Sequence, residues 1–235
     1  MKSQVRFLGF MIGNGKMWIT NKHINDTIGI KEQKNRKDFQ SQLGFLGYLR
    51  NFIPNFSMTM KSLYRLLKNE KKFIFTDEAR YSLDMIKTDV MGNEPLILPD
   101  LQKPFIIYTD ASQIGMSAAL VQDNHGNLEI VQWASKRFLL RELNYSVTEK
   151  ECLSVIWAVE KFKYFLHSSF TIRNDHHALK WLLELKEPKG RLARWIMKFS
   201  NFDFKFEYVK GSNNIVADPL SRRVVKESLI KMIKT

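Results

Sequence analysis

The sequence contains very little cysteine and no long hydrophobic run. Cys152 is the single cysteine among 235 residues, which excludes a disulfide framework within the chain and a zinc site built from several cysteines. The longest uncharged stretch, Ala111 to Gln122, contains serine and glutamine and falls short of the roughly 18 apolar residues that a membrane span needs. The first 13 residues lack the small-residue cleavage site of a signal peptide. We therefore expect a soluble, intracellular protein, in the cytoplasm or the nucleus, with no membrane partner.

Basic residues are in clear excess. Lysine and arginine number 37 against 24 acidic residues, which gives a formal net charge of +13, and the excess is spread along the chain. A hydrophobic fraction of 44% and an aromatic fraction of 12% are enough for a buried core, so global disorder is excluded. A folded protein of this charge suits a polyanion, most often nucleic acid, and charge that serves only solubility is the alternative.

The first 37 residues combine a strand pattern with a polar stretch. Residues 4–20 predict a β-hairpin, in which Val5 to Ile12 is one strand and Gly13-Asn14-Gly15 is the turn before the second strand. Residues 21–37 are polar and charged, and we interpret them as a loop.

Helical periodicity follows. Apolar residues at three- and four-residue spacing over 38–70 predict helices interrupted at Pro54. Thr76 opens a further predicted helix that continues to about Met91. Pro95 and Pro99 mark residues 94–100 as a linker.

Short strand-like runs alternate with helical patterns after Pro104. We expect strands at 105–108, 116–121, 130–134, 170–173 and 202–208, and helices at 147–167, within 176–200 and from Asp218. The order β-β-β-α-β-α-β-α predicts a mixed α/β domain.

Acidic residues stand at the ends of several of these elements. Asp110 and Asp175 end strands, Asp218 opens the last helix, and Glu149 or Glu151 lies in the first turns of the long helix. Such positions can converge on one crevice beside a sheet, where the carboxylates repel one another unless divalent cations neutralise them. Hard oxygen ligands select Mg²⁺ or Mn²⁺, and two such ions can support phosphodiester hydrolysis.

Each acid also has a purely structural interpretation. Asp218 suits the N-cap of a helix, Glu149 and Glu151 suit the positive end of a helix dipole, and Asp175 suits a turn. Asp110 is the hardest to assign in this way, because it directly follows a buried strand. The metal-site hypothesis therefore depends on the four positions together.

Five motifs follow one another along the chain: Thr109 to Ser112, Asn144 to Glu151, Arg173 to His176 with Leu179 to Leu183, Gly190 to Trp195, and Val216 to Arg222. Together they resemble the ribonuclease H domain of gypsy-type retrotransposon Pol polyproteins. Upstream, Phe45 to Ser57 resembles the thumb region that precedes this domain, and Val5 to Ile12 resembles the last hairpin of the reverse-transcriptase palm.

The resemblance implies a fold and a division of the chain. The fold is a ribonuclease H-like α/β domain with a five-stranded mixed sheet flanked by helices, preceded by a β-hairpin and a small helical thumb-like region. The expected parts are the palm end at 1–37, the thumb or connection region with its linker at 38–100, the ribonuclease H-like domain at 101–223 and a basic tail at 224–235.

The resemblance also implies an activity. The family's members cut the RNA strand of an RNA/DNA hybrid with two Mg²⁺ or Mn²⁺ ions, and the ligands here would be Asp110, Glu151, Asp175 and Asp218. Glu151 is preferred to Glu149 because Cys152-Leu153-Ser154 matches the segment that follows the family's glutamate. His176 matches a histidine near the family's site, where it could assist product release or proton transfer, and a surface histidine beside an aspartate is the alternative.

Basic residues near the third motif suggest how a hybrid is bound. Their spacing predicts one basic helical face, with a solvated face as the alternative, and the residues are Lys186, Lys189, Arg191, Arg194 and Lys198. The sequence has no Tyr-x-Asp-Asp motif, so polymerase activity is not expected. Two rival hypotheses are a catalytically silent nucleic-acid-binding remnant and a decayed reading frame that folds poorly. Association with a polymerase portion, or with a second copy, stays open.

Overall fold

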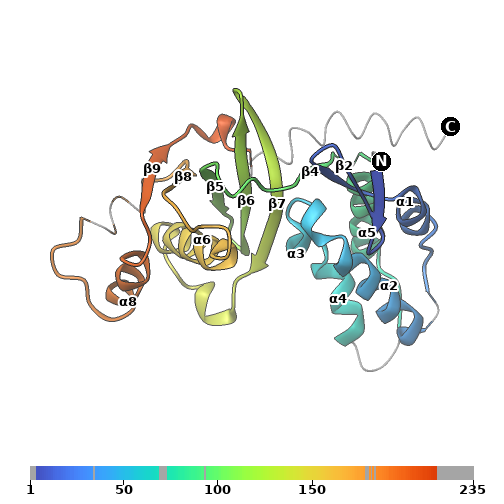
Figure 1. Ribbon diagram of the computed structural model, residues 1–235. Helices are drawn as coiled ribbons and strands as arrows, with labels where there is room; N and C mark the ends of the chain where they lie inside the picture. Colours follow the sequence, from blue (N-terminus) through green and yellow to red (C-terminus); the bar gives the residue numbers. More distant parts are fainter. Residues whose placement is uncertain are drawn as a thin grey trace. The chain divides into compact units, whose positions relative to one another are not determined.

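The computed structural model describes residues 4–33, 35–68, 73–92, 94–177, 180, 182 and 184–215. These residues form two compact units, of which the first extends to Leu98 and the second begins at Pro99 (Figure 1). The expected helix from Asp218 and the tail at 224–235 lie outside the described residues, and the division into four parts stays a prediction. Within the described ranges, no helix is both long enough and apolar enough to cross a bilayer.

Three short antiparallel strands open the first unit: β1 (Gln4–Phe7), β2 (Phe10–Gly13) and β3 (Lys16–Ile19). Asn14 and Gly15 both have positive φ in the β2–β3 turn, as a two-residue hairpin turn requires. Leu8 and Gly9 form a second turn with φ values of 45° and 76°, so the single strand expected over Val5 to Ile12 is wrong. Leucine seldom adopts this left-handed conformation, which is why the sequence carried little turn signal there.

A fourth strand comes from the expected linker. β4 (Leu96–Ile97) pairs with β3 and completes the sheet order β1-β2-β3-β4. The main-chain N–H of Leu98 also donates to the Gly15 carbonyl oxygen at 2.8 Å. The expected linker at 94–100 therefore contains a short strand, and the boundary between the two units, after Leu98, also falls within it. The strand is short and lies at the edge of its sheet, where flanking prolines are tolerated.

The rest of the first unit is helical. Its elements are α1 (Asn21–Ile28), α2 (Arg36–Tyr48), η1 (Arg50–Phe52), α3 (Phe56–Thr59), α4 (Lys61–Lys68) and α5 (Asp77–Met91). α5 begins where expected, because the Thr76 side chain accepts a hydrogen bond from the Ala79 N–H at 3.2 Å. The loop expected over 21–37 is wrong in its first half, where Thr20 caps α1. α1 buries only Thr27, so its sequence shows little apolar periodicity.

The second unit contains a five-stranded mixed sheet, which confirms the fold class expected from the sequence. Its strands, in the spatial order β7-β6-β5-β8-β9, are β7 (Asn127–Arg137), β6 (Gly115–Asn124), β5 (Phe105–Ala111), β8 (Phe170–Asn174) and β9 (Phe204–Tyr208). β5, β6 and β7 pair antiparallel, whereas β8 is parallel to β5 and β9 is parallel to β8. β5 and β8 therefore end at the same edge of the sheet.

The long helix α6 (Val147–Phe162) packs against β5 and β6 and ends earlier than the predicted His167 (Figure 1). Ile107, Leu120 and Ile172 are neighbours across three strands and are fully buried, as is Phe162. The remaining elements are η2 (Leu140–Glu142), α8 (Gly190–Phe199) and η3 (Gly211–Asn213). This apolar core holds the ends of β5 and β8 in fixed positions relative to the start of α6.

Candidate active site

Two of the predicted acids lie at the shared edge of the central strands. Asp110 is the penultimate residue of β5, and Asp175 directly follows β8. The first five residues of β5 are buried and its last two are half-buried, so the strand brings Asp110 from the core to the border of the solvent. Because β5 and β8 are parallel neighbours, the two carboxylates meet at the same edge.

The start of α6 separates the roles of its two glutamates. Ser146 caps the helix through a hydrogen bond from the Glu149 N–H, and the Glu149 carboxylate accepts a bond from the Ser146 N–H at 2.9 Å. The Glu149 carboxylate thus forms a reciprocal capping box with Ser146 and an ion pair with Arg191. It is not part of the acidic cluster. Glu151 lies more than half a turn further on, is only 5% exposed, and points towards the strand ends. The geometry thus favours Glu151 as the glutamate of the cluster.

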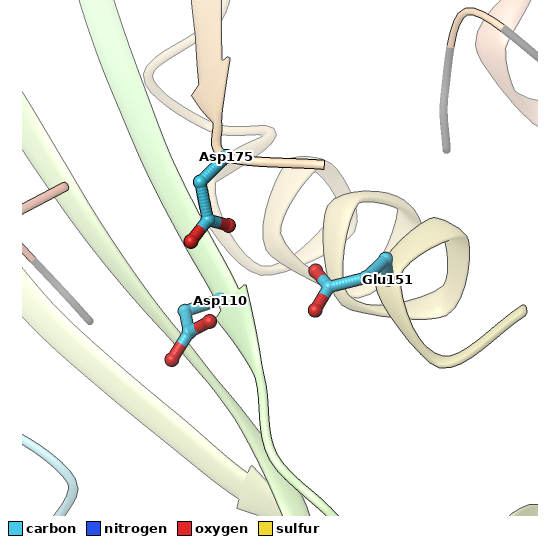
Figure 2. A group of neighbouring side chains, drawn as sticks. All are labelled: Asp110, Glu151 and Asp175. Atoms are coloured by element: carbon cyan, nitrogen blue, oxygen red, sulfur yellow. The ribbon is translucent and has the colours of Figure 1, made fainter. Parts of the chain in front are cut away.

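Three of the four predicted acids come together. Asp110, Glu151 and Asp175 each offer a carboxylate oxygen, and these oxygens lie within 4.8 Å of one another. Figure 2 shows the Glu151 side chain extending from α6 towards the two aspartates at the strand ends. Asp218 lies outside the described residues, so its place relative to the cluster stays a prediction.

Burial and mutual repulsion raise the pKa of two of the three clustered acids. Burial, with repulsion from Asp175, raises the pKa of Asp110 to about 6, although a hydrogen bond from the Ala111 N–H acts in the opposite direction. Burial also raises the pKa of Glu151 to about 8, with repulsion from both aspartates adding to it and the hydrogen bond from Asn174 opposing it. No lysine or arginine among the described residues forms an ion pair with these three acids, so their repulsion is not relieved within that part of the protein.

These properties fit a hard divalent cation. Three carboxylates at this separation supply the oxygen ligands that Mg²⁺ and Mn²⁺ prefer. A cation between them would offset the burial and the mutual repulsion that raise the pKa of Asp110 and Glu151.

The raised pKa values predict a pH-dependent stability. Asp110 and Glu151 bind protons more tightly in the folded than in the unfolded protein, so the free energy of unfolding falls as the pH rises from about 4 through 6 to about 8. In EDTA we expect a loss of about 1–3 kcal/mol over this range, and Glu151→Gln should abolish much of it. Thermal unfolding at pH 5, 6.5 and 8.5 measures the effect. A Tm difference between wild type and Glu151→Gln that does not change with pH would contradict it.

A buried polar network that the sequence analysis did not predict lies behind the carboxylates. The Asn174 side-chain nitrogen donates to Glu151 Oε2 at 3.1 Å, to the Thr109 carbonyl oxygen at 3.1 Å and to Thr109 Oγ1 at 3.0 Å. The Asn214 side chain donates to the same carbonyl oxygen at 2.9 Å. Thr109, Asn174 and Asn214 are all completely buried. The one available signal was the polar Asn174 in line with Phe170 and Ile172, the alternate residues of β8 that are buried.

The chain after β9 returns to this network. A Cβ atom added to Gly211 would lie 3.1 Å from Asp175 Oδ2, so only a residue without a side chain leaves the aspartate its present space. The Asn214 side chain donates a hydrogen bond to the carbonyl oxygen of Thr109, the residue that precedes Asp110. The described chain therefore passes beside the carboxylates four residues before Asp218.

His176 follows Asp175 directly and is half-buried. Its main-chain N–H donates to Asn174 Oδ1 at 2.6 Å, which fixes the turn after β8. Its Nδ1 atom is buried and has no hydrogen-bond partner within the described part of the chain. The neighbouring His177 stacks on Tyr208 with a centroid separation of 4.5 Å.

The five residues of the predicted basic face do not all lie on α8, and two of them form ion pairs with α6. α8 begins at Gly190, so Lys186 and Lys189 precede the helix, and the expectation that all five cations share one helical face is wrong. Arg191 pairs with Glu149 and stacks over the Tyr145 ring at 4.3 Å, and Lys198 pairs with Glu160. Those two pairs connect α8 to α6. Spacing identifies residues on one side of a helix but not the element that this side contacts.

Arg194 differs from its neighbours on α8. It is exposed and forms no ion pair with the residues that the structure describes. Lys186 and Lys189 are likewise exposed. Of the five predicted cations, these three reach solvent without a described acidic partner, and nucleic-acid binding by any of the five stays a prediction.

Comparison with known families identifies the class of the second unit. Residues 100–202 match the family model described as the RNase H-like domain found in reverse transcriptase. This range contains Asp110, Glu151 and Asp175 and lies within the unit that carries the five-stranded sheet. The fold and the sequence match agree that the second unit is an RNase H-like domain.

Longer relatives extend the similarity to both units. The chain is 34% identical over 231 residues to the retrovirus-related Pol polyprotein from transposon 297 of Drosophila melanogaster, covering 97% of this chain and 21% of that polyprotein. It is 33% identical over 229 residues to the transposon Tf2-3 polyprotein of Schizosaccharomyces pombe, covering 95% and 17%. The chain is thus similar to one part of these retrotransposon Pol polyproteins and spans about a fifth of their length.

Solved structures of similar fold are also found. A foamy viral protease-reverse transcriptase in complex with double-stranded DNA matches with a TM-score of 0.76 at 25% identity, covering 89% of this chain and 45% of that chain. The foamy viral enzyme in complex with an RNA/DNA hybrid matches with a TM-score of 0.74 at 25% identity, covering 88% and 29%.

Proposed function

We propose that this chain is a metal-dependent endonuclease that hydrolyses the RNA strand of RNA/DNA hybrids, and that it derives from a gypsy-type retrotransposon. The observation that carries the proposal is the cluster of Asp110, Glu151 and Asp175, whose oxygens lie within 4.8 Å in an RNase H-like domain. The complex of the foamy viral relative with an RNA/DNA hybrid supports the choice of substrate. The five motifs of the sequence support the gypsy-type origin.

The carboxylates of Asp110, Glu151, Asp175 and Asp218 would hold two Mg²⁺ or Mn²⁺ ions. Ions in such a site supply Lewis-acid activation of a water molecule and stabilise the charge on the leaving oxygen. The three described acids stand on a packed sheet edge and on the helix that covers it, so their positions are set before substrate binds. Asn214 lies beside the cluster, and four residues of chain span at most about 14 Å, which supports a ligand role for Asp218.

His176 and the exposed cations would act on the substrate. His176 directly follows Asp175 and is half-buried, so the part of its ring that reaches solvent would carry a proton away from the site or contact a departing phosphate. Lys186, Lys189 and Arg194 would neutralise backbone phosphates, with Arg191 and Lys198 contributing where their ion pairs allow. A hybrid is distinguished by the 2′-hydroxyls across its wide minor groove, so no base sequence needs to be read.

A panel of labelled duplexes tests this proposal. The RNA strand of an RNA/DNA hybrid should be cut in Mg²⁺ or Mn²⁺, whereas double-stranded DNA should remain intact and EDTA should stop the reaction. Binding to each duplex is measured in parallel by fluorescence anisotropy in EDTA. Folded protein that binds the hybrid but cuts it in neither metal would support the silent binding remnant instead, and protein without a cooperative unfolding transition would support the decayed reading frame.

A further inference from the structure

Asn174 links three elements at the acidic cluster. It is the last residue of β8, directly precedes Asp175, and has no exposed surface. Its side-chain nitrogen donates to Glu151 on α6 and to Thr109 on β5, and its side-chain oxygen accepts from the His176 N–H. One buried amide thus connects the helix, the neighbouring strand and the turn that carries Asp175.

The Asn174 amide is the side chain that donates to the Glu151 carboxylate, which also accepts from the Ala111 N–H. A glutamate side chain has several rotatable bonds, and this one extends from α6 towards two other carboxylates (Figure 2). When Glu151 ionises to bind a cation, its carboxylate becomes a third negative charge beside Asp110 and Asp175, and repulsion then favours rotamers that turn it away from them. The 3.1 Å hydrogen bond from Asn174 holds Glu151 Oε2 in place against this repulsion without adding a positive charge to the site.

We propose that Asn174 is a positioning residue for divalent cations, because its amide fixes the Glu151 carboxylate beside Asp110 and Asp175 before a cation arrives. The inference rests on the proposed function and adds to it a determinant of metal affinity that is not itself a ligand. Partners that orient metal ligands commonly change metal affinity 10- to 100-fold when they are removed. A role confined to joining β5 and β8 would lower stability and leave metal affinity unchanged.

Metal binding without nucleic acid provides the test. We would titrate Mn²⁺ into the full chain and follow the binding heat by calorimetry and the rise in Tm. Asn174→Ala should raise the Mn²⁺ concentration for half-maximal effect about tenfold relative to wild type. The serine side chain of Asn174→Ser is too short to reach Glu151 from the same position, so this variant should also raise the Mn²⁺ midpoint. It replaces the alanine variant in the test if that variant does not fold.

Gln122 provides a matched control in the same domain. It is also a buried amide, 2% exposed, and its side chain bonds backbone groups of Asp100 and Lys103 at the other end of the sheet from the acids. Gln122→Ala should lower the Tm in EDTA but change the Mn²⁺ midpoint less than twofold. In a Glu151→Gln background, Asn174→Ala should cause no further shift in the midpoint, since the group it positions has been altered.

The outcomes separate this inference from the proposed function. Wild type that binds Mn²⁺ and cuts the hybrid, together with an Asn174→Ala midpoint equal to that of Gln122→Ala, would overturn the positioning role and leave the nuclease intact. Wild type that shows no Mn²⁺ response would overturn both. A tenfold shift that persists in the Glu151→Gln background would show that Asn174 acts by another route, and would also overturn the inference.

Discussion

Replacing Asp110 with asparagine is expected to lower the rate of RNA cleavage in an RNA/DNA hybrid about 1,000-fold. Asp110 lies at the end of the central strand, within 4.8 Å of Glu151 and Asp175, so it belongs to the charge that would hold the cations. An amide has almost the same shape as the carboxylate but brings no negative charge. The rate is measured from single-turnover cleavage of labelled RNA in Mn²⁺.

The same substitution should not weaken the fold. Asparagine removes a negative charge that is both buried and repelled by Asp175, so the Tm in EDTA at pH 8 should equal or exceed that of wild type. Asp203→Asn is a matched control, because Asp203 is an exposed aspartate of the same domain, before β9. It should keep the wild-type rate within about twofold. Asp110→Asn protein that cuts at a comparable rate would exclude Asp110 from the site.

The two glutamates of α6 should differ sharply. Glu151→Gln is expected to lower cleavage by about 1,000-fold, whereas Glu149→Gln should keep the rate within about threefold of wild type. Glu151 is buried against the aspartates, while Glu149 closes the capping box and pairs with Arg191. Glutamine can still accept the capping hydrogen bond, so losing the ion pair should cost only about 0.5–1 kcal/mol of stability. Parallel single-turnover rates and urea unfolding measure both effects.

The comparison can fail in two informative ways. Loss of activity in Glu149→Gln with activity retained in Glu151→Gln would reverse the assignment of the metal ligand. Equal losses in both, with Glu149→Gln also strongly destabilised, would mean that the contact between Glu149 and Arg191 supports the site through the packing of α8 on α6.

Much of the second unit was predictable because its elements have strong patterns. The apolar runs around Ile107 and Ile172 gave the central strands, and the acids that follow them gave two members of the cluster. Spacing alone does not distinguish Glu149 from Glu151, because both lie within the first turns of one helix. Only tertiary packing shows which of them faces the sheet. Motif resemblance favoured Glu151, and the packing of α6 agrees with it.

The missed features depend on contacts that no local pattern records. Leu8 adopts a left-handed turn that its residue type disfavours, and α1 exposes most of its surface. Asn174 has a role only because β5, β8 and α6 meet around it. Arg191 shares a helical spacing with other cations, but its partner lies 42 residues away in the sequence. Long-range contacts of this kind follow from the assembled fold, and not from spacing.

Metal-dependent cleavage by the wild-type chain tests the central claim most directly. Protein stripped with EDTA is mixed with an RNA/DNA hybrid labelled on the RNA strand, and then Mg²⁺ or Mn²⁺ is added in excess of the chelator, with Asp110→Asn in parallel. We predict that wild type leaves the RNA uncut before the metal is added and cuts it afterwards, whereas Asp110→Asn leaves it uncut throughout. Well-folded wild type that binds the hybrid and leaves the RNA whole in both metals would contradict the assignment of this carboxylate cluster as a nuclease site.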